Sequence, residues 1–88
     1  MFSIICPCYN SENYLNYSLG SVMNQEIEAS LYEVICIDDG SIDNTQNMLL
    51  NYKKKFEAKG IKFKIISQNN KGPGAARNRG IEEAQHPY

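Results

Sequence analysis

The chain has 88 residues, of which 42% are hydrophobic and 22% charged, a composition typical of one small globular domain rather than a collagen-like or disordered chain. Nine Lys and Arg residues stand against ten Asp and Glu residues, and a formal net charge of −1 gives no general attraction for nucleic acid or an anionic membrane. No apolar run approaches the roughly 18 to 20 residues needed to cross a bilayer, so we expect no membrane segment in this chain.

The first quarter of the chain predicts a strand followed by a helix. Residues 2–6 form an apolar run without helical spacing, which is typical of a buried parallel strand. Apolar side chains then recur at helical spacing over residues 14–23. Ser11 or Asn10 is available to cap the first turn of this helix.

The middle of the chain predicts a second strand, a second helix and a third strand. Residues 33–37 are β-branched and nearly continuously apolar, as expected of a central strand. The helix that follows opens around residues 41–45 and ends at Lys59, with Gly60 in the position that favours a left-handed residue. Residues 62–66 alternate apolar and basic side chains, which predicts a third strand with one exposed face.

A third helix is predicted from near Gly74 to Ala84, weakened by Gly80. The element order is then β-α-β-α-β-α. Strands joined by helical crossovers lie parallel, and right-handed crossovers that move consistently outward give strand order 3-2-1. The predicted fold class is therefore α/β, a Rossmann-like three-layer half-domain with a parallel sheet.

Three loops converge at the carboxyl edge of such a sheet, at residues 7–10, 38–41 and 67–74, and open α/β sheets bind ligands there. Asp38 and Asp39 stand at the tip of the second strand. A carboxylate at this point can accept hydrogen bonds from a ribose hydroxyl or from the imide N–H of a pyrimidine base. The alternative is that either Asp only caps the helix that follows.

The other two loops narrow the ligand class. Residues 68–74 are rich in glycine and polar side chains and lead into a helix that carries Arg77 and Arg79, which favours a pyrophosphate site over a plain polar turn with surface arginines. Tyr9 can stack on a base or simply pack. The first loop lacks G-x-G-x-x-G and the chain lacks a P-loop motif, which excludes typical dinucleotide binders and P-loop hydrolases.

Three cysteines, Cys6, Cys8 and Cys36, are interpreted as free thiols in a reducing compartment. A metal site built on Cys6 and Cys8 needs further ligands, and one distant Cys with a lone His86 is weak support for it. We therefore expect no metal site, and Cys8 receives no role.

Four segments, in order and at matching spacing, resemble the front half of inverting family-2 glycosyltransferases with the A-type fold. The resemblance covers essentially the whole chain and implies one domain, residues 1–88, that is a truncated nucleotide-sugar-binding half. The segments read FSIICPCYN at 2–10, SVMNQ at 21–25, YEVICIDDGSIDNT at 32–45 and NKGPGAARNRG at 70–80.

The resemblance also implies a set of binding residues. Pro7 and Tyr9 would line the nucleotide pocket, Asp39 would contact the base, and Asp38 would adjoin it. The segment that passes near the ribose and diphosphate would contribute Lys71, Gly74, Arg77 and Asn78. The implied donor is a nucleotide-diphosphate-sugar, with a UDP-sugar as the first expectation.

Two parts of the family pattern are missing from this sequence. The resemblance implies a divalent cation, Mg or Mn, held by an Asp-x-Asp motif after a fourth strand, and no Asp-x-Asp occurs here. The carboxylate that would act as general base is also absent. We therefore assign no catalytic and no metal-binding residue, and we expect the isolated chain to be inactive.

The predicted function is that of a glycosyltransferase in polysaccharide or glycoconjugate synthesis, of which this chain carries the nucleotide-binding half. The alternatives are a non-catalytic nucleotide-binding module and an inert truncation. In strand order 3-2-1 the first strand is an edge, so we expect a homodimer or other self-association through it. The expected location is the cytoplasm, including the inner face of the membrane for the full-length protein.

Overall fold

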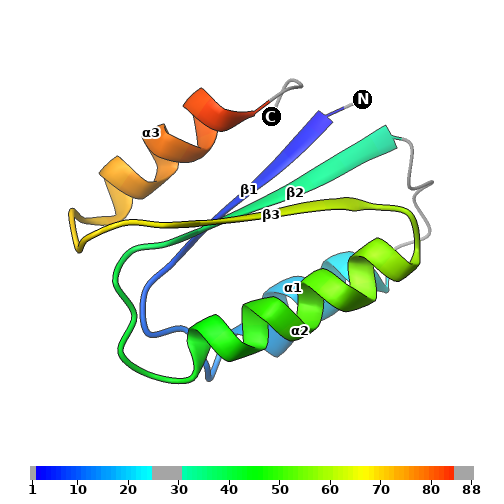
Figure 1. The fold of residues 1–88 in the computed structure, drawn as a ribbon, viewed down its shortest axis with the longest axis horizontal. Coiled ribbons are helices and arrows are strands. Elements are labelled where there is room, and N and C mark those ends of the chain that lie inside the picture. Colours follow the sequence, from blue (N-terminus) through cyan, green and yellow to red (C-terminus); the bar gives the residue numbers. More distant parts are fainter. Residues whose placement is uncertain (1, 25–30, 85–88) are drawn as a thin grey trace.

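The protein is described by a computed structural model that covers residues 2–24 and 31–84, and strands and helices alternate along it (Figure 1). The elements in chain order are β1 (Phe2–Cys8), α1 (Leu15–Met23), β2 (Tyr32–Asp38), α2 (Thr45–Ala58), β3 (Lys62–Ser67) and α3 (Pro73–Glu83).

The three strands form one parallel sheet in which β2 lies between β1 and β3. Counted from the other edge, this is the predicted order 3-2-1, and the α/β half-domain is confirmed. The register places Cys6 opposite Cys36 and Cys8 opposite Asp38. Every residue of β2 is buried, whereas β3 alternates between buried and exposed residues in its first half, as its sequence predicts.

Two helical layers cover the sheet. Figure 1 shows α1 and α2 together on one face and α3 alone on the other. The larger core lies under α1 and α2, where branched and aromatic side chains fill the space against the sheet. Its largest fully buried members include Leu15, Leu19, Leu49 and Phe56.

The smaller core lies between the sheet and α3, and it depends on a close approach of the α3 backbone to the sheet. Ile35, Ile37 and Ala76 are fully buried there. Gly80, which the sequence shows only as a weak point of the helix, faces the sheet: a Cβ at this position would clash with Ile5 Cγ2 and lie 3.0 Å from Ile37 Cδ1. The missing side chain is what lets α3 pack directly on β1 and β2.

The expected cap of α1 is wrong. Its N-cap residue is Tyr14, without a capping side-chain hydrogen bond, and not Ser11 or Asn10. Both polar side chains are engaged in the loops instead: Asn10 Oδ1 accepts the Ile42 N–H (2.9 Å), and Ser11 Oγ accepts the Tyr9 N–H (3.1 Å). A contact with the loop after β2 has taken the Asn10 side chain, and a turn within the loop after β1 has taken that of Ser11, so neither caps the helix.

The other element ends differ less from expectation. β1 runs two residues past its predicted end at residue 6 and reaches Cys8 through Pro7, which an edge strand tolerates because its outer N–H positions need no partner in the sheet. After α2, Gly60 has φ of 80°, the left-handed conformation expected after a helix. No helix within residues 2–24 and 31–84 has the length and apolarity to cross a membrane.

Candidate functional site

The loops that follow β1 and β2 are joined by hydrogen bonds from backbone amides to side chains. The Asn10 N–H donates to Ser41 Oγ (2.9 Å), and the Ser11 N–H donates to Thr45 Oγ1 (2.8 Å). Asn10 adopts φ of 47°, a left-handed conformation that Asn tolerates better than most residues. The first two loops therefore form one connected rim at the carboxyl end of the sheet.

Asp39 connects this rim to the third loop. Its N–H donates to the Cys8 carbonyl (2.8 Å) at the end of β1. Its Oδ1 accepts hydrogen bonds from the Gln68 side-chain amide (2.9 Å) and the Lys71 N–H (2.8 Å), and its Oδ2 accepts the Gly72 N–H (2.9 Å). Asp39 thus connects all three strand ends, through its backbone N–H to the end of β1 and through its side chain to the loop after β3.

These donors stabilise the ionised form of Asp39. The Lys71 N–H and then the Gln68 amide stabilise the carboxylate and lower its pKa from the usual value of 3.8; burial opposes them, and the Gly72 N–H and the charge of Lys71 add to the lowering. Asp39 is therefore fully ionised at neutral pH. A carboxylate has about four acceptor positions, and three are occupied here, which leaves about one for a ligand.

Asp38 lies differently from its neighbour. Its side chain is fully buried, and its Oδ1 accepts the Ser41 N–H (3.0 Å) at the turn after β2. Its backbone carbonyl accepts the Gln68 N–H (2.9 Å). Because side chains alternate along a strand, Asp38 points to the sheet face that carries α1 and α2, and it does not line the pocket described next.

A pocket of about 440 Å³ opens between the three loops and the start of α3. Its wall combines an exposed aromatic ring, a carboxylate and glycine backbone. The lining residues are Pro7, Cys8, Tyr9, Ser11, Asp39, Asn70, Gly72 and Ala76.

The structure brings some of the predicted site residues together and leaves others apart. Pro7, Tyr9 and Asp39 line the pocket, and Lys71 touches Asp39 through its backbone N–H. The remaining predicted residues of α3 are exposed and do not line the pocket. They are Gly74, Arg77 and Asn78.

The pocket also contains residues that sequence reasoning did not select, among them Ser11, Asn70, Gly72 and Ala76. A close backbone approach explains Asn70: a Cβ on Gly40, whose φ is 80°, would lie only 3.2 Å from the Asn70 amide nitrogen. The sequence feature that indicates this approach is Gly40 directly after the two aspartates, because a glycine with positive φ lets another backbone come near.

A protein-family model and several known proteins match nearly the whole chain. The family described as Glycosyl transferase family 2 matches residues 3–88. The minor teichoic acid biosynthesis protein GgaA of Bacillus subtilis is 48% identical over 82 residues, which are 92% of this chain and 18% of GgaA. The chain thus spans less than a fifth of the length of this curated relative.

Solved structures agree in fold. The crystal structure of Staphylococcus aureus TarS 1–349 in complex with UDP superposes with a TM-score of 0.84 and 33% identity, over 97% of this chain and 24% of that one. A mannosyltransferase from Pyrobaculum calidifontis, solved with GDP-Man and Mn²⁺, gives a TM-score of 0.85 at 19% identity over 96% of this chain and 24% of that one.

Proposed function

The chain belongs to glycosyl transferase family 2, and we propose that it forms the nucleotide-binding half of an enzyme that transfers a sugar from a nucleotide-diphosphate-sugar to an acceptor. The observation that carries this proposal is the position of Asp39 at the pocket. Its ionised carboxylate accepts hydrogen bonds from three donors and still has about one acceptor position free. The transfer is proposed to invert the anomeric carbon in a single displacement.

The proposed base is uracil. Its imide N–H is a donor that suits the remaining acceptor position of Asp39. Tyr9 is 49% exposed and lines the pocket wall, where its ring can flank the base by stacking. The binding of UDP by TarS, which is 33% identical over nearly the whole chain, supports this choice.

The diphosphate is proposed to lie toward the start of α3. The first turn of a helix has amide groups without intrahelical partners, and here Gly74 adds no side chain and has open space in front of it. The exposed side chains of Lys71 and Arg77 can add positive charge, and Asn78 can add a polar contact. Asp38 is proposed to act indirectly, by holding the turn that positions Asp39.

The described residues supply neither a divalent cation site nor a general base at this pocket. The one carboxylate in the lining is Asp39, and both of its oxygens already accept hydrogen bonds. Members of the GT-A fold generally use a divalent cation, but the residues described here do not fit one at the pocket. We therefore propose that this chain alone binds the donor and does not transfer the sugar.

The proposed acceptors are cell-surface polymers. GgaA acts in teichoic acid biosynthesis by its name, and a poly(ribitol-phosphate) β-glucosyltransferase of Bacillus spizizenii is 41% identical over 86 residues, which are 98% of this chain and 13% of that enzyme. The three free thiols fit a reducing compartment, so we propose the cytoplasm, at the inner face of the membrane, as the place of action.

A second proposed property concerns assembly. β1 pairs with β2 on one side only within the described sheet, and its outer edge offers backbone groups to another strand. This observation favours self-association of the chain through β1. Self-association can occur together with donor binding or without it.

Titration with UDP, followed by NMR chemical shifts, tests the donor site. We expect Tyr9→Ala to weaken UDP binding about fivefold to a hundredfold, because an aromatic stacking contact with a base contributes about 1 to 3 kcal/mol. Tyr17→Ala is the matched control, since this ring is 81% exposed on α1 and does not line the pocket.

Asp39→Ala should also weaken binding, and GDP should bind less tightly than UDP to the wild-type chain. Equal UDP affinity in Tyr9→Ala, Asp39→Ala and Tyr17→Ala would mean that the nucleotide binds elsewhere. UDP and GDP binding with the same affinity would remove the uracil assignment but leave a nucleotide site in place.

A further inference from the structure

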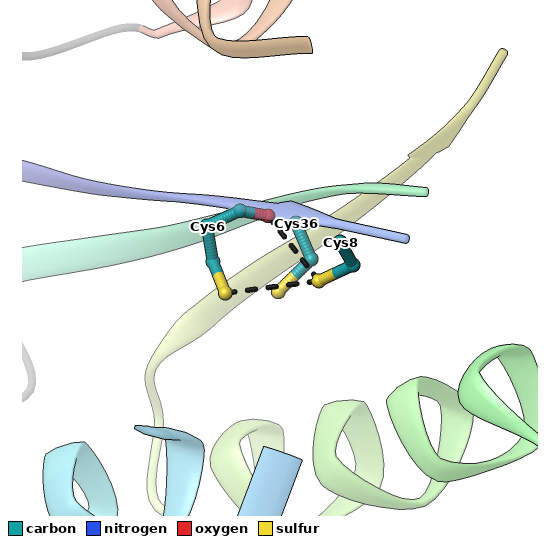
Figure 2. Close-up of side chains that lie close together, drawn as sticks. All are labelled: Cys6, Cys8 and Cys36. Atoms are coloured by element: carbon teal, nitrogen blue, oxygen red, sulfur yellow. Dashed lines mark hydrogen bonds between the residues drawn. The ribbon is translucent and has the colours of Figure 1, made fainter. Parts of the chain in front are cut away.

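The three cysteines form a cluster on the sheet face that α1 and α2 cover (Figure 2). Cys6 lies opposite Cys36 in the register, and Cys8 follows two residues later on β1 with its side chain on the same face. Cys6 Sγ and Cys8 Sγ are 3.7 Å apart, and all three sulfur atoms lie within 4.8 Å of one another. The thiols are free, and Figure 2 shows their sulfur atoms converging.

The separation of Cys6 Sγ and Cys8 Sγ is that of two ligands in a metal-thiolate centre, and Cys36 Sγ lies within 4.8 Å of both. Zinc binds thiolate sulfur at about 2.3 Å, and tetrahedral geometry then places two sulfur ligands about 3.8 Å apart. The cluster comes close to this arrangement without any change of the strands that carry it.

A buried carboxylate borders the cluster. Asp38 lies two residues after Cys36 and opposite Cys8, so its side chain leaves the sheet on the same face. Its Oδ1 accepts the Ser41 N–H, but its Oδ2 has no hydrogen-bond partner among the described residues, although the side chain is completely buried. An unsatisfied buried acceptor is costly, and a cation beside it would remove that cost.

We propose that Cys6, Cys8 and Cys36 bind one thiophilic metal ion of the zinc class, with the buried Asp38 carboxylate beside the site. Thiolate ligands select zinc and similar soft ions, whereas a cation that neutralises a diphosphate prefers oxygen ligands, so this site is separate from the family's catalytic cation. Cys6 is the partly exposed member of the cluster and lies on the edge strand, which gives the ion a route in. Binding releases the thiol protons to solvent.

Titration of the reduced chain with Co²⁺ and then Zn²⁺ tests the site. We expect one Co²⁺ per chain, with sulfur-to-cobalt charge-transfer absorption and the ligand-field bands of a tetrahedral ion. One equivalent of Zn²⁺ should displace it, and Zn²⁺ binding should release protons in weakly buffered solution. A folded, reduced chain that gives no sulfur-to-cobalt absorption would overturn the proposal.

Variants distinguish the effect of losing a metal ligand from the effect of any change in the sheet. Cys36→Ala and Cys6→Ala should each lower metal affinity by at least about a hundredfold, because loss of a mere outer-shell partner already costs about 10- to 100-fold. Asp38→Asn should lower it at least about tenfold while keeping an oxygen for the Ser41 N–H. The control is Ile5→Val, on the opposite face of β1, which should bind metal like the wild-type chain.

A measurement on the unaltered chain covers the case in which a cysteine variant does not fold. Zn²⁺ should slow alkylation of all three thiols together, as read by mass spectrometry. Alkylation rates that do not change with Zn²⁺, or metal affinity that survives replacement of all three cysteines, would place the ion elsewhere and refute the site.

Discussion

Asp39 has a structural task that a ligand-contact role alone would not predict. Its carboxylate accepts the N–H groups of Lys71 and Gly72, and so it fixes the backbone of the third loop. We therefore expect substitution of Asp39 to act on the pocket in two ways, by removing the acceptor proposed for the base and by releasing the loop. An experiment that changes the charge of Asp39 without a ligand separates the second effect from the first.

The pH dependence of the free energy of unfolding shows how much the Asp39 carboxylate stabilises the third loop. Because its pKa is lowered in the folded chain, its contribution is complete at neutral pH, begins to be lost as pH falls toward 3.8, and is gone below the lowered value. We therefore expect Asp39→Asn to be less stable than wild type at pH 6, and the difference to shrink as pH falls below 4.

Urea unfolding at a series of pH values measures this difference. Gln46→Ala, at an exposed position on α2, is the control and should show a difference from wild type that does not change with pH. A constant gap between wild type and Asp39→Asn from pH 6 to pH 3 would show that the carboxylate does not hold the loop.

The sequence predicted Asp39 as a site residue because an acidic residue stands at the tip of a buried strand. It could not distinguish the separate tasks of Asp38 and Asp39 without knowing where the strand ends, because the face of each side chain follows from that point. The cysteine cluster was missed for a related reason. Cys36 is distant from Cys6 in sequence, and only the register of two nearly uniformly apolar strands places them side by side.

At the scale of elements, the packing of α3 against the sheet depends on the absence of a side chain at Gly80. Gly80→Ala would place a methyl group against Ile5 and Ile37, and overpacking costs typically about 1 to 3 kcal/mol. The better helix propensity of Ala returns about 1 kcal/mol. We expect the variant to lose up to about 2 kcal/mol of unfolding free energy.

The matched control lies in the same helix. Gly74 has no atom within 4 Å of the position that a Cβ would take, so Gly74→Ala should be neutral or stabilising by up to about 1 kcal/mol in urea unfolding. Similar changes in both variants would show that helix propensity, and not contact with the sheet, decides the effect at Gly80.

All six elements were predictable in type and order, because each carries a clear apolar period or run. Their ends were less predictable. The start of α1 moved to Leu15 because Asn10 and Ser11 bond across to the loop after β2, a contact that no local pattern reveals. The role of Gly80 was equally hidden, since propensity counts it as a weakness and only packing shows why a side chain is excluded.

At the scale of the whole molecule, we expect the outer edge of β1 to decide whether the chain self-associates. Its first residue, Phe2, is 37% exposed and stacks on Tyr32 with ring centroids 5.8 Å apart, so an apolar surface accompanies the open backbone. Edges of this kind pair with other chains unless charge or proline blocks them. We expect the chain to form dimers at high concentration.

Sedimentation at several concentrations, with amide exchange at Ile4 and Ile5, checks this expectation. Phe2→Lys should shift the chain toward monomer, because a charged side chain at an edge disfavours strand addition. Ile42→Lys, at an 89% exposed position in the loop after β2, should leave the dimer unchanged. A wild-type chain that stays monomeric with rapid exchange at both amides would show that the edge does not pair.

The hydrogen bonds that join the three loops have a kinetic consequence. Asn10, Ser11 and Asp39 already hold the walls of the pocket in place without a ligand, so a nucleotide that binds there spends little free energy on ordering the chain. Association should then proceed at the rate of an ordinary preformed site, without a slow conformational step. Discrimination between nucleotide-sugar donors would then come from their residence times. Variants at Tyr9 or Asp39 should differ from the wild-type chain mainly in the dissociation rate of the nucleotide.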